Sequence, residues 1–70
     1  MTITNISPIS VTEFSDTVHR VREGATTVGF VRVCDTVYVS LLGENYSKAV
    51  EIGQSLDLPT AVAMLSQTHL

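Results

Sequence analysis

Residues 25–42 read ATTVGFVRVCDTVYVSLL and carry the strongest β-strand signal in the chain. Two runs rich in Val, Thr, Phe and Tyr flank a short polar break at Cys34–Asp35, a composition typical of two strands joined in a hairpin. Neither run alternates cleanly between apolar and polar residues, as a sheet with one solvated face would. We therefore expect both faces of this hairpin to be covered, by helices on one face and by a second copy of the chain on the other.

The size and charge of the chain limit what it can be. Its 70 residues form one domain at most, with a small core that favours oligomerisation. The apolar content of 44% indicates a folded chain. The single cysteine excludes an intrachain disulfide, and together with the N-terminal sequence it leads us to expect a cytoplasmic protein without a membrane segment. We expect no metal or other cofactor, and no catalytic motif is recognisable.

Ser10 to Glu23 predicts a helix. Ser10 and Glu13 are spaced as a capping box, and Ile9 and Phe14 as a hydrophobic staple. An apolar stripe at helical spacing would follow, with a glycine at its end. The stripe consists of Val11, Phe14, Val18 and Val21, and the glycine is Gly24.

The remaining segments complete a small α+β unit. Thr2 to Ser7 predicts a short edge strand that ends at Pro8. Gly43 to Leu56 predicts a second helix, and Pro59 suits the first turn of a third. The predicted order is strand, helix, strand, strand, helix, helix, with an antiparallel sheet, helices on one face and a dimer.

This pattern resembles the Phd/YefM family of type II antitoxins over roughly residues 3 to 50. Members open with a short strand ending in I-S, followed by a helix, a V-x-I-T-R strand, a second strand and an acidic-aromatic helix start. The corresponding positions here are Ile6-Ser7, then Phe14, Val18, Val21 and Gly24, then Val28, Phe30, Val31 and Arg32, then Val37, Val39 and Ser40, then Glu44, Asn45 and Tyr46.

The resemblance implies a non-catalytic homodimer that binds a cognate toxin and represses its own operon. Residues 1–57 would form the dimerisation domain, and residues 58–70 would form a partner-binding helix or tail. The candidates for operator DNA contact are Arg20, Arg22 and Arg32. The candidates for partner contact are Leu58, Ala61, Val62, Met64 and Leu65.

Other interpretations fit the same residues. Arg20 and Arg22 can be ordinary surface charge near a helix C-terminus, and Arg32 can pair with a carboxylate of a second chain. The apolar residues from Leu58 onward can complete the chain's own core. The net charge of −3 and the lack of a basic residue in Val11–Ser15 favour an alternative function, a stand-alone interaction or inhibitor module that does not bind DNA. A ribbon-helix-helix regulator built on Val37 to Leu65 ranks last.

Overall fold

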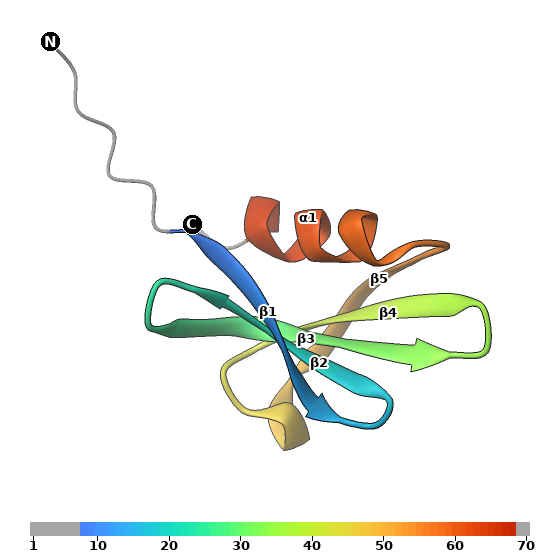
Figure 1. Ribbon diagram of the computed structural model, residues 1–70, viewed down its shortest axis with the longest axis horizontal. Helices are drawn as coiled ribbons and strands as arrows, with labels where there is room; N and C mark the ends of the chain where they lie inside the picture. The colour runs from blue at the N-terminus through green and yellow to red at the C-terminus, as the bar shows by residue number, and fades with distance from the viewer. Residues whose placement is uncertain (1–7, 69–70) are drawn as a thin grey trace, which may run out of the picture.

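A computed structural model describes residues 8–68 of the chain. These residues form a five-stranded antiparallel sheet and one C-terminal α-helix (Figure 1). The elements in chain order are β1 (Ile9–Ser15), β2 (Val18–Glu23), β3 (Thr26–Cys34), β4 (Val37–Leu42), the 3-10 turn η1 (Tyr46–Lys48), β5 (Val50–Ser55) and α1 (Leu58–Thr68).

The sheet is a meander, in which each strand pairs with its neighbours in sequence, in the order β1-β2-β3-β4-β5. Two-residue turns at 16–17, 24–25 and 35–36 connect the first four strands. Gly24 and Asp35 have positive φ angles of 61° and 54°, which suit tight hairpin turns. The predicted hairpin of residues 25–42 is present as β3 and β4.

The predicted fold class is wrong. The segment Ser10–Glu23 forms β1 and β2 rather than a helix, and Gly43–Leu56 forms η1 and β5. The apolar spacing of the first segment misled the prediction, because Val18 and Val21 pack in different core clusters. The β-branched residues of the segment favour strands once neighbouring strands are available for pairing. Of the predicted helices, only the one with Pro59 in its first turn exists, as α1.

α1 lies on one face of the sheet, above small residues of three strands (Figure 1). A Cβ atom on Gly29 would lie 2.9 Å from Leu65 Cδ2, and one on Gly53 would lie 2.8 Å from Met64 Sδ. Ser40, between these strand positions, is fully buried. The helix therefore sits close to the sheet because these positions carry almost no side chain. The core on this side comprises Val21, Val28, Val31, Ala61 and Leu65.

The opposite face has its own smaller core, formed by Val18, Phe30, Val39 and Leu41. Tyr46 and Ala49, from the segment that connects β4 to β5, pack against it. Both faces of the hairpin are thus covered by the same chain, so the packing argument for a second copy on the hairpin no longer holds.

Some predictions fall on the ends of the chain. The predicted strand Thr2–Ser7, including the Ile6-Ser7 match, lies outside the described residues, as do His69 and Leu70. Within residues 8–68, the helices are too short or too polar to cross a membrane.

Candidate functional site

The sheet face opposite α1 carries the three arginines that the sequence singled out. Directly paired residues of neighbouring strands share a face, so the strand register defines rows across the sheet. Two adjacent rows on this face contain one arginine each. One row is Thr12, Arg20, Phe30, Leu41 and Glu51, and the next is Ser15, Val18, Arg32, Val39 and Gln54.

Three aromatic rings gather on this face. The centroid of Phe14 lies 5.0 Å from that of Phe30 and 5.5 Å from that of Tyr46, and the Phe30 and Tyr46 centroids are 5.4 Å apart. Phe30 is only 1% exposed, whereas Phe14 is 42% exposed. Phe14 lies at the point where the β1–β2 register shifts, between Glu13 and Ser15. Phe14 and Tyr46 therefore cover Phe30, and Phe14 presents apolar surface to solvent.

Arg20 lies against this group of rings. Its guanidinium carbon is 5.0 Å from the Phe14 centroid and 6.0 Å from the Phe30 centroid, within the range of cation–π attraction. Its Nε is buried and has no hydrogen-bond partner among residues 8–68. Stacking on the two rings therefore orients the planar Arg20 guanidinium.

Arg32 lies in the adjacent row, next to the Tyr46 side chain. Hydrogen bonding with Tyr46, and secondarily with Cys34, raises the pKa of the Arg32 guanidinium above its ordinary value. Arg32 follows Phe30 by two positions on β3, and Phe30 pairs directly with Arg20. The two arginines are thus diagonal neighbours, for which Cβ separations of about 7–8 Å are typical. We call Arg20, Arg32, Phe14, Phe30 and Tyr46 the arginine–aromatic cluster.

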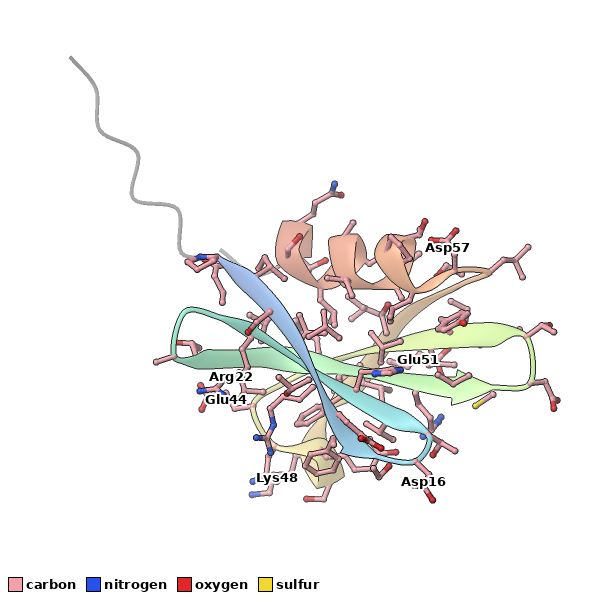
Figure 2. The ribbon with its side chains drawn as sticks, in the orientation of Figure 1. Asp16, Arg22, Glu44, Lys48, Glu51 and Asp57 are labelled. Carbon is pink, nitrogen blue, oxygen red and sulfur yellow. The ribbon has the colours of Figure 1, made fainter. Side chains whose placement is uncertain are left out.

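The structure separates Arg22 from the other two DNA-contact candidates. The β2–β3 register shifts between Val21 and Arg22, and Arg22 has no stacking contact comparable to that of Arg20. In Figure 2, Arg22 and Glu44 project at one end of the sheet, away from Asp16. Arg22 lies on the same sheet face as Arg20, two positions along β2, but of the two only Arg20 stacks on the aromatic rings.

The five partner-contact candidates all lie on α1. Ala61 and Leu65 are completely buried, and Leu58 and Val62 pack against the same core. Met64 Sδ lies 3.6 Å from the Ser40 hydroxyl oxygen. These side chains serve the chain's own core in this structure, which is the alternative that the sequence left open for this segment.

Sequence reasoning missed the aromatic partners of the arginines. Phe30 and Arg32 stand two positions apart in one strand, which places them on one face, and this signal was available. The contribution of Phe14 was hidden because residues 10–23 were assigned to a helix. No group of three or more residues that could bind a metal ion occurs among residues 8–68.

Comparisons with known proteins give no relatives: no family model, no curated protein and no solved structure matches the chain.

Proposed function

We propose that this protein is a non-catalytic, cytoplasmic binding module that uses the arginine–aromatic cluster to bind an acidic segment of a partner protein. The observation that supports the proposal is the placement of Arg20 and Arg32 as diagonal neighbours on one sheet face, with Arg20 stacked on Phe14 and Arg32 next to the Tyr46 side chain. Side chains that are already oriented lose less conformational entropy on binding than free surface arginines.

The chemistry of the cluster suits carboxylates beside apolar groups. A guanidinium matches a carboxylate in a planar, two-pronged hydrogen-bonded pair. Arg and Tyr are enriched among the residues that dominate binding energies at protein interfaces. The exposed part of Phe14 adds apolar contact area next to Arg20. A peptide that alternates acidic and apolar side chains would satisfy both features.

The charge of the chain favours a protein over a nucleic acid. Nucleic-acid affinity depends on neutralising many phosphates, and the chain has four basic residues and a net charge of −3. Glu51 also lies in the same row as Arg20 and Phe30. An acidic residue there disfavours a continuous phosphate backbone more than it disfavours one or two carboxylates.

The antitoxin and operon-repressor function stays an untested prediction. Part of the resemblance rested on a helix at Ser10–Glu23, which the structure replaces with two strands. We instead propose the alternative function, a stand-alone interaction module, and assign its binding surface to the arginine–aromatic cluster.

The test is a binding titration monitored by fluorescence anisotropy. The probe is a labelled peptide of alternating Glu and Leu, and the comparison peptides replace Glu by Gln or by Lys. We expect saturable binding of the Glu peptide that weakens with added salt, and no saturation with the other two. Equal binding of the Glu and Gln peptides would contradict the proposal.

Arg22 provides the matched control. Arg20→Gln and Arg22→Gln remove the same charge from the same strand, but only Arg20 belongs to the arginine–aromatic cluster. We expect Arg20→Gln to raise the dissociation constant of the Glu peptide about tenfold, as loss of a good charged hydrogen bond does. Arg22→Gln should change it less than about twofold, since Arg22 lacks the stacking contacts that orient Arg20 and its remaining long-range attraction is weakened by salt. An equal loss of affinity for the Glu peptide in both variants would indicate non-specific electrostatic attraction.

A further inference from the structure

β1 is an exposed edge of the sheet. Among residues 8–68 it pairs with β2 alone, and all of its residues, Ile9 to Ser15, are exposed. α1 packs on β2 to β5. Ile9 and Val11 are each 39% exposed, on the same side of the sheet as the buried Val21, which is the pairing partner of Val11.

The hydrogen-bond pattern shows which backbone groups of β1 point outward. The Gly24 N–H donates to the Pro8 carbonyl at 3.0 Å, immediately before the pair Ile9–Glu23. Along an antiparallel strand, the backbone N–H and C=O groups of successive residues point alternately toward one neighbouring strand and away from it. Ser10 and Thr12 therefore bond to β2, while the N–H and C=O groups of the intervening residues Ile9, Val11 and Glu13 face outward.

This edge lacks the features that usually prevent strand pairing. Ile9–Ser15 contains no lysine and no proline, and its register shift comes only after Glu13. Proteins protect exposed edges with such residues or with bulges. The other edge, β5, has a register shift in its middle, opposite Ser40 and Leu41. β1 is thus the edge better suited to accept another strand.

We propose that β1 pairs with β1 of a second copy of this chain, antiparallel and centred on Val11, to give a continuous two-fold symmetric sheet. Only residues whose backbone N–H and C=O groups point outward can form hydrogen bonds across the new interface, so each of them must lie opposite another such residue. Centring on Val11 satisfies this at all three positions, with Ile9 opposite Glu13, Val11 opposite Val11 and Glu13 opposite Ile9. A shift of the centre by one residue in either direction leaves only two matched positions.

The side chains fit the same register. Val11 meets Val11 of the second copy, so that two half-exposed apolar side chains cover each other. Ser10 faces Thr12 of the second copy on the opposite side of the sheet, a pairing that hydroxyl groups favour. Glu13 faces Ile9, so that no like charges are directly opposed.

The two proposals share β1, which contributes Phe14 to the cluster, but they use opposite sides of the sheet at Val11. Val11 lies on the α1 side of the sheet, whereas the arginine–aromatic cluster lies on the other side. A monomeric variant is therefore expected to keep its affinity for the Glu peptide, which distinguishes failure of one proposal from failure of the other.

The first test uses Val11→Lys, with Val50→Lys as the matched control on the β5 edge, where Val50 is 64% exposed. Mass and dissociation constant are measured by sedimentation equilibrium, and folding by circular dichroism. We expect the wild type to be a dimer. Val11→Lys should raise the dissociation constant of the dimer about tenfold or more, because two lysines would face each other. Val50→Lys should leave the dissociation constant unchanged. A wild-type monomer at millimolar concentration, or dissociation only in Val50→Lys, would overturn the proposal.

The second test addresses the register. Val11→Lys and Val11→Glu should each weaken the homodimer, and an equimolar mixture should form a heterodimer because Lys and Glu would then face each other. Failure of the mixture to associate more tightly than either variant would rule out a centre at Val11. Hydrogen exchange gives a check on the wild type: the amides of Ile9, Val11 and Glu13 should gain protection with concentration, while those of Ser10 and Thr12 should be protected throughout.

Discussion

The Ser40 hydroxyl donates a hydrogen bond to the Ala61 carbonyl oxygen at 2.9 Å, joining the centre of the sheet to the first half of α1 across 21 residues of sequence. Ser40 is the one fully buried polar residue among residues 8–68, and it pairs with Val31 on one side and Gly53 on the other. A serine here is small enough for close helix packing, and its polar group has a partner. The contact therefore fixes both the distance and the position of α1 on the sheet.

Ser40→Ala should destabilise the fold by about 1 kcal/mol, the usual net contribution of one buried hydrogen bond. Ser66 offers a control, because its hydroxyl bonds to Ala63 within α1 and makes no link to the sheet. Ser66→Ala should lower the free energy of unfolding by clearly less. Urea denaturation measures both free energies of unfolding. Equal losses would mean that the Ser40 contact does not anchor the helix.

The two glycines beneath α1 should differ in their tolerance of alanine. A Cβ on Gly29 would come within 2.2 Å of the Leu41 backbone oxygen, which cannot move without disturbing β4. A Cβ on Gly53 would meet only Met64, through its flexible thioether end. We expect Gly29→Ala to be more destabilising than Gly53→Ala by at least about 1 kcal/mol, measured by thermal and urea unfolding. The reverse order would contradict the described helix position.

Asp57 should make stability depend on pH in the acidic range. Its carboxylate accepts a hydrogen bond from the Thr60 N–H at 2.8 Å, immediately before α1. Hydrogen bonding to Thr60, from both side chain and backbone, lowers the pKa of Asp57 below its ordinary value of 3.8. The folded state therefore binds this proton less readily than the unfolded state. The stabilisation is present above about pH 4 and is lost as the pH falls through the lowered pKa.

Asp57→Asn is the matched variant, because asparagine also caps helices but does not titrate. Comparing melting temperatures of wild type and variant between pH 7 and pH 2 isolates the contribution of Asp57. The difference between the two proteins should shrink as the pH falls below 4. A constant difference over that range would show that the cap does not titrate as described.

Tyr46→Phe should weaken partner binding while preserving the fold. The ring contacts of Tyr46 with Phe14 and Phe30, at 5.5 Å and 5.4 Å, do not need the hydroxyl group. Arg32 would lose a hydrogen-bonding partner and with it part of its orientation. We expect the melting temperature to change little and the dissociation constant of the Glu peptide to rise about threefold to tenfold. An unchanged affinity would show that Arg32 does not contribute to peptide binding.

The sequence predicted the β3–β4 hairpin well, because β-branched runs around a short polar turn have few other interpretations. It failed for residues 10–23, where valines and Phe14 happen to recur at helical spacing. A contrary signal was present: Ser15-Asp16-Thr17-Val18 closely matches Cys34-Asp35-Thr36-Val37. Both tetrapeptides form tight turns between strands. The second helix failed for a related reason, since Gly53 marks close approach to α1 rather than a weak helix.

The candidate site was only partly predictable. The sequence identified Arg20 and Arg32 but also Arg22, because the stacking that distinguishes Arg20 from Arg22 is a tertiary contact that a strand pattern does not show. Tyr46 reaches the cluster from a turn between β4 and β5, a long-range contact that no local pattern encodes. The apolar residues of α1 were ambiguous because partner surfaces and cores have similar compositions.

The measurement to make first is a chemical-shift map of the ¹⁵N-labelled wild-type protein titrated with the Glu–Leu peptide. The account predicts the largest shifts at Arg20, Phe30, Arg32 and Tyr46, including the arginine side-chain signals, with α1 little affected. Shifts concentrated on the outer surface of α1, or spread evenly over all basic residues, would contradict a binding site on the arginine–aromatic cluster.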